Sequence, residues 1–377
     1  MQSRIGLFNI LEELEDPREN KHSSRHLLVD ILVLTILAVI CGADNWVAIE
    51  KFGESKMDWL KTFLRLPHGI PSHDTIGNLF ARLEPKLLQD CFLRWINEVF
   101  HFSGGEIIAI DGKTLRRSHN RKKGQGAIHM VSAWASRNQL VLGQRQVDDK
   151  SNEITAIPEL LKMLDIEGCT ITIDAMGCQK KIAEQIYEQG GDYVLAVKEN
   201  QGKLHEKIEH LFADGEAKSY EAMWYRQHST IDGGHGRVET RNYTVLPMMY
   251  LPFFKLKWKG LQSIAMVESV REIGDERTTE RRYFISSLAA DAKIISEAIR
   301  QHWTIENQLH WSLDMSFNED NCRVRKGNAA GNLSIIRHIA LNLLKHESSA
   351  KVGIKIKRRK AGWSQQYLAK VLAIAQL

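Results

Sequence analysis

The chain has 377 residues, of which 43% are hydrophobic, and it carries a formal net charge of +5 at pH 7. This length suits two or three domains, or one core with a large insertion, and the composition is ordinary for a soluble protein. The five cysteines are widely scattered and form no C-x-x-C pair. This pattern argues against a disulfide scaffold or a zinc site and favours a reducing cytoplasm.

Residues 1–100 are expected to be helical, because apolar residues recur there at helical spacing. The most apolar segment runs from Leu27 to Ala43. It contains Asp30 and is short for the hydrocarbon core of a bilayer, so we predict a buried core helix and no membrane span. Neither a signal peptide nor a membrane anchor is expected.

A further helix is predicted to start at Ser72, a favourable N-cap residue that follows a turn rich in Pro and Gly. Thr75, Asn78 and Arg82 are spaced along one side of this helix. A helix that follows a tight turn in this way is typical of a DNA-reading helix, although an ordinary amphipathic helix explains the same pattern.

From Glu106 the pattern changes to short β-rich runs that alternate with helices. We predict strands at 107–111, 127–135, 139–147, 169–175 and 192–198, and helices at 155–165 and 179–191. Pro158 is placed in the first turn of the first of these helices. This order of elements indicates a mixed sheet covered by helices. Residues 200–290 are then β-rich, which suggests an inserted subdomain, and helices return from Asp291.

Two of the predicted strands run into an aspartate. The apolar run Ile107–Ile110 is followed by Asp111 and Gly112, and the strand at 169–175 reaches Asp174. Neighbouring strands would place the two carboxylates side by side, where their charges repel unless a cation lies between them. We interpret the pair as ligands of a shared divalent metal; two turn-forming aspartates are the alternative.

A third oxygen ligand is expected on the helix that follows Asp291. Glu306 lies there among aromatic and apolar residues, so we expect a half-buried carboxylate that needs a partner, either a metal or Arg300. The rival third ligands are Asp314, Glu319 and Asp320. Oxygen ligands without a Cys/His cluster favour Mg²⁺ or Mn²⁺ over Zn²⁺, and two such ions would support in-line displacement at a phosphodiester.

Basic residues are concentrated near the end of the chain. Between Asn321 and Lys360, eleven Lys or Arg accompany a single acid, Glu347. This segment suggests a polyanion partner such as DNA, or a solvated helix face.

Long motifs throughout the chain resemble one family. They are "AIDGKTLRRS", "GAIHMVSAW", "KSNEITAIPELLKMLDIEGCTITIDAMGCQKKIAEQI", "GGDYVLAVKENQ", "HGRVETR" and "RQHWTIENQLHWSLDMSFNEDNCRVRKGNAA". Together with the helical segment before them, they resemble the H-repeat-associated group of bacterial insertion-sequence DDE transposases. The resemblance implies an α/β fold with an RNase H-like mixed-sheet catalytic core and a β-rich insertion, preceded by a helical, DNA-binding N-terminal domain. The expected divisions are 1–100 for that domain, 101–199 for the first part of the core, 200–290 for the insertion, and 291–377 for the helical remainder with a basic tail.

The resemblance also implies a DDE triad of catalytic and metal-ligating residues. It maps onto Asp111, Asp174 and Glu306. Related transposases carry Tyr, Arg and Lys around the glutamate, where this chain has Ile299, His302 and Leu313. Phosphate contacts on this helix are therefore expected to depart from the wider pattern, with His302, His310, Arg323 or Lys326 as substitutes.

The implied activity is metal-dependent hydrolysis at insertion-sequence ends followed by strand transfer to target DNA. Mg²⁺ or Mn²⁺ is the expected cofactor, double-stranded DNA the partner, a homodimer the DNA-paired form, and the bacterial cytoplasm with its nucleoid the location. The expected DNA contacts are Lys113, Arg116, Arg117, Lys180, His235, Arg237, His302, Arg323, Arg325 and Lys326. A catalytically lapsed DNA-binding remnant and an RNase H-like structure-specific nuclease are the alternatives.

Overall fold

The N-terminal part of the structure is helical. The computed structural model describes residues 6–18, 24–99, 105–119, 126–147, 152–234 and 236–373. The helices before the first strand are α1 (Leu7–Glu12), α2 (Leu28–Ile40), α3 (Trp46–Ser55), α4 (Met57–Leu60), α5 (His73–Arg82) and α6 (Pro85–Val99). α5 follows Ser72, whose hydroxyl accepts a hydrogen bond from the amide of Thr75 at 3.3 Å, so the predicted N-cap is confirmed.

The described strands form one mixed sheet of nine strands in the order β3-β2-β1-β4-β5-β9-β8-β7-β6. The core strands are β1 (Ile107–Thr114), β2 (His129–Ala135), β3 (Leu140–Gln146), β4 (Thr170–Ile173) and β5 (Asp192–Val197). β1, β2 and β3 form an antiparallel meander, whereas β4 pairs in parallel with β1, and β5 with β4. An antiparallel meander followed by two parallel strands is the RNase H-like arrangement, and the expected fold class is confirmed.

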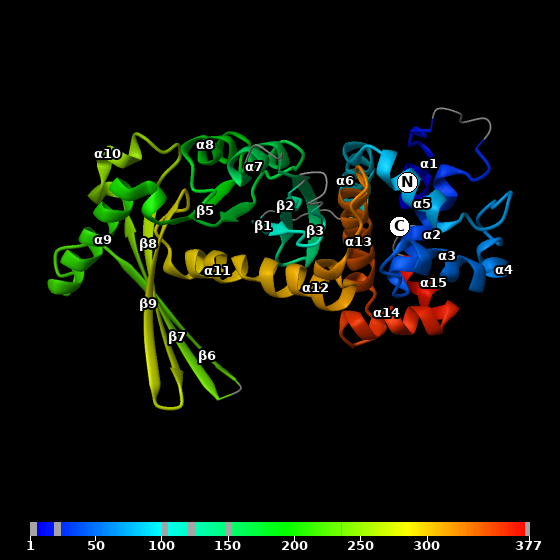
Figure 1. The fold of residues 1–377 in the computed structure, drawn as a ribbon. Coiled ribbons are helices and arrows are strands. Elements are labelled where there is room, and N and C mark those ends of the chain that lie inside the picture. Colours follow the sequence, from blue (N-terminus) through cyan, green and yellow to red (C-terminus); the bar gives the residue numbers. More distant parts are fainter. Residues whose placement is uncertain are drawn as a thin grey trace, which may run out of the picture.

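The β-rich insertion continues the core sheet. Its elements are α9 (Gly202–Ala217), β6 (Arg226–Gly234), β7 (Arg237–Pro247), α10 (Pro252–Lys255), β8 (Ser263–Ile273) and β9 (Glu276–Ser286). The four strands pair antiparallel, and β9 also pairs with β5 of the core. Figure 1 shows their hairpins projecting beyond the core. The insertion is therefore held to the core through the sheet itself.

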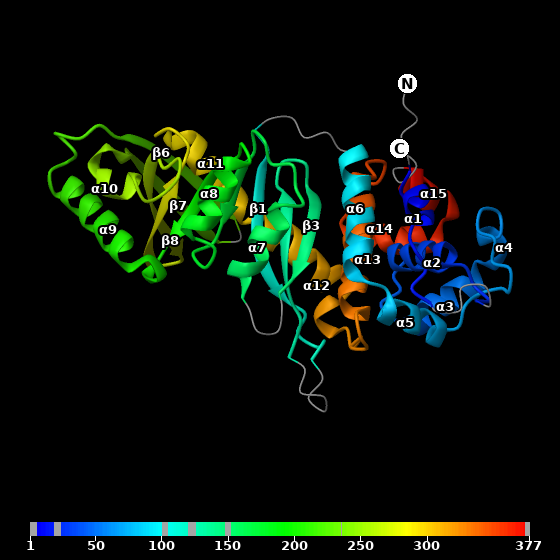
Figure 2. The same cartoon turned by 90° about the horizontal axis from the view of Figure 1, so that it is seen from above.

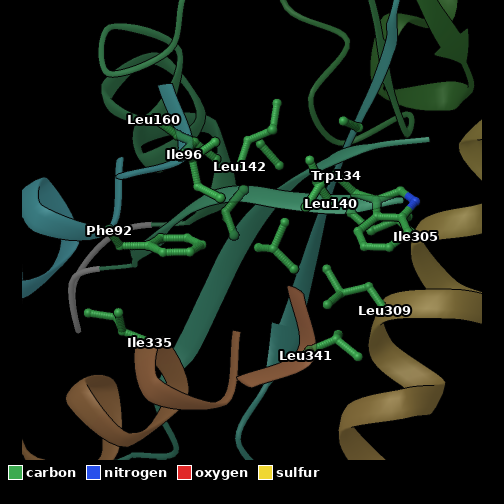
Figure 3. Packing of buried hydrophobic residues seen from close by; sticks show 14 of the residues in the cluster. Phe92, Ile96, Trp134, Leu140, Leu142, Leu160, Ile305, Leu309, Ile335 and Leu341 are labelled. Atoms are coloured by element: carbon green, nitrogen blue, oxygen red, sulfur yellow. The ribbon is translucent and has the colours of Figure 1, made fainter. Parts of the chain in front are cut away.

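Helices cover both faces of the core sheet (Figure 1). One face carries α7 (Glu153–Leu161) and α8 (Lys180–Glu188), and the other carries α11 (Ala292–His302), the π-helical turn η5 (Ile305–His310) and α12 (Trp311–Phe317). Trp134 of β2 lies with Ile305 and Leu309 in the core (Figure 3). Its indole N–H also donates to Oγ1 of Thr304 at 3.0 Å. These contacts anchor the helix that carries Glu306 against the sheet.

The helical region beside the sheet is built from both ends of the chain. α13 (Ala329–His346) is buried from Ala329 to Leu344 and contacts α2, α5, α6 and β3. α14 (Ile354–Trp363) contacts α2 and α12, and α15 (Gln365–Ala373) contacts α13 and α14. Figure 2 shows α6 and α13 between the sheet and the other helices of this region. The N-terminal helices therefore share their core with the end of the chain.

α2 is a buried core helix, as its sequence predicts. Every residue of the helix except Val29 is buried. The carboxylate of Asp30 accepts hydrogen bonds from the backbone amides of Leu66 at 2.8 Å and Arg65 at 3.4 Å, which satisfy this buried charge. No helix in the described part of the chain is long and apolar enough to cross a membrane.

Part of the basic C-terminal segment is buried and holds the fold together. The ammonium of Lys357 donates to the carbonyls of Leu344, at 2.8 Å, and Glu347. The guanidinium of Arg358 donates to the carbonyls of Val39 and Ser316 and to the carboxylate of Asp44. Both side chains are buried. The interpretation of this segment as a basic tail that faces a polyanion is therefore wrong for these two residues.

Candidate active site

Asp111 and Asp174 lie next to each other on neighbouring strands. β1 and β4 pair in parallel up to Ile110 opposite Ile173, so the following residue of each segment is one of the two aspartates. Because adjacent strands are about 4.8 Å apart, this register brings the two carboxylates together where β4 ends. Both aspartates line one cavity of about 230 Å³. The structure thus contains the juxtaposition that the sequence pattern predicts.

Asp111 lies inside its strand. β1 continues to Thr114 and stays paired with β2 over its whole second half, so the prediction of a strand that ends at Asp111 is wrong. Pairing between β1 and β4 stops at Ile110. Beyond that residue one edge of β1 is open, and Asp111 occupies the position where the open edge begins.

The two aspartates lie in an environment that disfavours their charges. Burial raises the pKa of Asp111 to about 7, and the nearby charges of Asp174, Glu153 and Glu306 act in the same direction. Burial also raises the pKa of Asp174, although its Oδ1 accepts hydrogen bonds from the amides of Met176 at 3.0 Å and Gly177 at 3.3 Å. A cation would offset this mutual repulsion.

Glu306 reaches the same cavity from the helical layer. It lies in η5, and its side chain lines the cavity together with the aspartates. π-Helical turns occur frequently at functional sites. The residue is exposed, so the prediction of a half-buried side chain is wrong, yet partial burial still raises its pKa while the charge of Arg282 lowers it. Arg300, the alternative partner, instead pairs with Asp232 at 3.2 Å.

The donor chemistry of the site fits a divalent metal. Three carboxyl groups supply hard oxygen ligands, which suit Mg²⁺ or Mn²⁺, and the like charges around Asp111 are those that a cation would neutralise. In the arrangement described here, however, no three His, Cys, Asp or Glu side chains among the described residues are gathered as a metal site. Asp111, Asp174 and Glu306 therefore line a common cavity without forming a three-ligand metal site in this arrangement.

The rival third ligands belong to a separate cluster around Lys113. Its ammonium lies 2.6 Å from Asp314, 3.0 Å from Asp320 and 3.6 Å from Glu319. The Lys113 side chain is only 11% exposed. These acids are already paired with a cation, and Lys113 is enclosed by carboxylates. The Lys113 ammonium thus faces acids in this arrangement, and its expected contact with DNA stays a prediction.

His302 and His310 are half-buried near the three acids, and His302 lines their cavity. Nδ1 of His302 lies 3.0 Å from Oγ1 of Thr172, and burial lowers the pKa of His302 to about 4. Nδ1 of His310 lies 3.6 Å from Asp111, and burial lowers its pKa to about 4 as well. Both rings are neutral at physiological pH. Any contact of His302 with a phosphate would therefore be a hydrogen bond from a neutral ring, and its expected role as a DNA contact stays a prediction.

Glu153 is a fourth carboxylate near the site that sequence reasoning missed. Its Oε1 lies 2.5 Å from Nε2 of His129, whose Nδ1 lies 2.9 Å from Oγ1 of Thr114. α7 starts at Glu153 after the N-cap Asn152, two residues earlier than predicted, and Pro158 lies inside the helix. The signal was present, because an Asn followed by an acid is a good helix start.

Gly112 leaves room for the side chains of this pair. A Cβ atom at residue 112 would lie 2.0 Å from Oε1 of Glu153 and 2.5 Å from Nε2 of His129. The φ angle of Gly112 is not positive, so a close approach of side chains, and not a turn, explains the glycine. The Asp-Gly step thus combines a carboxylate on one side of the strand with space for Glu153 on the other.

Gly112→Ala should lower the free energy of unfolding by about 1–3 kcal/mol, because the methyl group displaces Glu153 and His129. Chemical denaturation measures this change. Gly233→Ala is the matched control, since its Cβ would meet nothing within 4 Å in another strand. Adding Glu153→Ala to Gly112→Ala should restore part of the lost stability. Equal stabilities of the two alanine variants would contradict the close contact.

Other expected DNA contacts gather in a groove between the helical region and the segment after α12. Arg323, Arg325 and Lys326 line this groove of about 750 Å³, together with Asn78 of α5. Nζ of Lys326 donates to Oδ1 of Asn78 at 2.5 Å, and Nε of Arg325 donates to the carbonyl of Arg117 at 2.8 Å. The structure therefore places α5, the predicted DNA-reading helix, beside part of the basic C-terminal segment.

The remaining expected contacts are dispersed. Arg116 is exposed and lies 3.2 Å from Asp320, and Lys180 is exposed at the start of α8. Arg237 lines a different cleft, between the insertion and α11. His235 lies outside the described residues.

Comparison with known proteins identifies the family of this chain. A family model described as "Transposase DDE domain" matches residues 102–343, and one described as "DDE_Tnp_1-associated" matches residues 8–96. The Escherichia coli K12 protein named "H repeat-associated putative transposase YhhI" is 46% identical over 353 residues, which cover 92% of this chain and 93% of that protein. "Putative transposase YncI" of Escherichia coli O157:H7 is 44% identical over 377 residues, covering 99% and 95%. A cryo-EM structure of a piggyBac transposase synaptic complex with hairpin DNA aligns with a TM-score of 0.48 and 12% identity over 98% of this chain and 80% of that one.

Proposed function

Since this chain belongs to the family of transposases with a DDE domain, we propose that it cuts DNA at the ends of an insertion sequence and joins them to target DNA. Asp111, Asp174 and Glu306 are the proposed catalytic residues. The observation that carries this proposal is the common cavity that the three carboxylates line, with each aspartate directly after the paired part of two adjacent parallel strands and the glutamate on the facing helix.

The proposed roles follow from the environment of each side chain. Asp111 and Asp174 would hold the metal from the sheet, and Glu306 from the helix. Divalent ions bound there would activate the attacking water or 3′-hydroxyl and stabilise the leaving oxygen. The backbone amides of Met176 and Gly177 orient the carboxylate of Asp174, and the ring of His310 packs beside Asp111. The protein thus keeps the ligands in place on rigid elements.

Double-stranded DNA is the proposed partner. The groove lined by Arg323, Arg325 and Lys326 offers positive charge next to α5, and contacts of this kind neutralise phosphates and set the register of the duplex. Pairing of two DNA ends favours a homodimer in the DNA-bound form. We place this activity in the bacterial cytoplasm, on nucleoid DNA.

Removal of divalent metal tests the proposal. The purified full chain, incubated with Mg²⁺ or Mn²⁺ and a labelled duplex that carries the inverted repeat flanking its coding region, should produce nicked and joined DNA. The same mixture with EDTA should bind DNA without cutting it, because the carboxylates need the cation. DNA binding without any cutting in Mg²⁺ would instead identify a lapsed, DNA-binding remnant, and cutting without joining a structure-specific nuclease.

A further inference from the structure

One face of the insertion sheet concentrates charged side chains. Because side chains alternate across a strand, residues 237, 239 and 241 of β7 share a face. The strand register places them with residues 269 and 271 of β8 and residues 278, 280 and 282 of β9. The side chains on this face include four arginines and two glutamates. The sequence of the insertion therefore encodes a strongly polar sheet face next to α11.

This face forms one wall of a cleft of about 520 Å³, and α11 with η5 forms the other. Among the described residues, five arginines and two glutamates line the cleft, a formal charge of +3. They are Arg237, Arg241, Arg271, Arg282, Arg300, Glu239 and Glu280. Asp232, which contacts Arg241 and Arg300, reduces this charge and leaves it positive. A positive cleft with few apolar groups suits a polyanion.

Most of these guanidinium groups are held in place by neighbouring acids. Arg241, only 12% exposed, lies 2.5 Å from Asp232 and 2.7 Å from Glu239. Arg282 lies 2.8 Å from Glu280 and stacks on Trp303, 4.9 Å from the ring centroid. Positioned guanidinium groups lose little conformational entropy when they bind an anion, and their planar donors match phosphate oxygens.

Two further arginines of the cleft, Arg271 and Arg237, are exposed to solvent. Arg271 is exposed, and none of the ion pairs found among the described residues includes it. The side chain of Arg237 is 51% exposed and lies 4.0 Å from Glu239, at the limit of an ion pair. The guanidinium donors of Arg271 and Arg237 are therefore the ones in the cleft that are most available to a ligand.

The cleft adjoins the cavity of the three acids. Glu280, Arg282 and Trp303 line both. We propose that this arginine cleft binds the sugar-phosphate backbone of the DNA strand that continues from the phosphate cut at Asp111 and Asp174. The proposal rests on the proposed DNA-cutting function, and it adds a binding site in the insertion to the groove beside α5.

Salt-dependent DNA binding tests the arginine cleft. Arg271→Gln and Arg237→Gln should each weaken binding of a short labelled duplex of arbitrary sequence by roughly 3- to 10-fold and reduce the slope of log K against log salt by about 1. Arg277→Gln is the matched control, because Arg277 lies on the opposite face of the same sheet and is 68% exposed. It should leave both the affinity and the slope at the wild-type values. Thermal melting should show that all three variants stay folded.

The outcomes separate this proposal from the proposed function. If Arg271→Gln and Arg237→Gln bind like Arg277→Gln over the whole salt range, the arginine cleft is not a DNA site. If the cleft variants lose affinity while the wild-type chain fails to cut DNA in Mg²⁺, the cleft stands as a DNA site and the catalytic proposal fails.

Discussion

Asp111→Asn should lower the rate of DNA cutting by roughly 10³-fold or more, the size of effect seen when one member of a catalytic constellation is removed. The amide keeps the shape of the side chain, so β1 and its pairing with β4 should persist. It removes the charge at the centre of the acidic cavity, where Asp174, Glu153 and Glu306 all act on Asp111. Single-turnover cutting of an end-containing duplex measures the rate.

The control for this variant is Asp165→Asn, an exposed acid in the loop before β4. It removes the same charge away from the cavity and should cut DNA at the wild-type rate. Asp111→Asn should also keep the DNA affinity of the wild-type chain, because it leaves unchanged every basic residue that we assign to DNA, including Arg282 of the same cavity. Cutting by Asp111→Asn at a rate near that of the control would place the chemistry elsewhere.

Arg358→Met should lower the free energy of unfolding by about 3–5 kcal/mol, because it removes a buried charge and leaves its acceptors without donors. The guanidinium of Arg358 bonds to the carbonyl of Val39 at 2.8 Å and to Asp44 at 3.0 Å, and it lies 4.2 Å from the ring centroid of Phe317. Methionine matches the length of the arginine stem and supplies none of these bonds. Urea denaturation monitored by Trp fluorescence measures the change.

Arg359→Met is the matched control, since Arg359 is the next residue and is exposed. It removes the same charge and should change the stability by no more than about 0.5 kcal/mol. The pair also distinguishes a structural segment from a DNA-binding tail. A tail that binds DNA through both residues predicts equal losses of affinity and no large loss of stability in either variant.

Local patterns in the sequence were sufficient for much of the fold. The strand that contains Asp111 and the strand that ends just before Asp174 are recognisable because apolar runs of strand length are encoded within a few residues. The buried α2 and the N-cap Ser72 were predictable for the same reason. The end of β1 was misjudged, because its continuation to Thr114 depends on pairing with β2 and not on its own hydrophobicity.

The roles of individual charged residues were less predictable. Lys113 is surrounded by acids of which Asp314 is 201 residues away in the sequence, and the main acceptor of Arg358, Val39, is 319 residues away. Nothing in the residues next to a lysine or arginine indicates whether such an acceptor will be present. The sequence does not reveal the position of Glu153, because its closeness to Gly112 and His129 arises only when α7 packs on the sheet.

The sequence by itself determined the family of the chain, the class of its fold and the two aspartates at the sheet, because motifs and hydrophobic periodicity are properties of short segments. Only the tertiary structure decided which charged side chains are free to bind a ligand and which are enclosed by partners within the protein. It brought Glu306 into the cavity of the aspartates, enclosed Lys113 and Arg358 among acceptors, and aligned the arginines of the insertion along one cleft. The physical reason is that a buried charge is stable only with a partner, and the partner is chosen by which distant segments pack together.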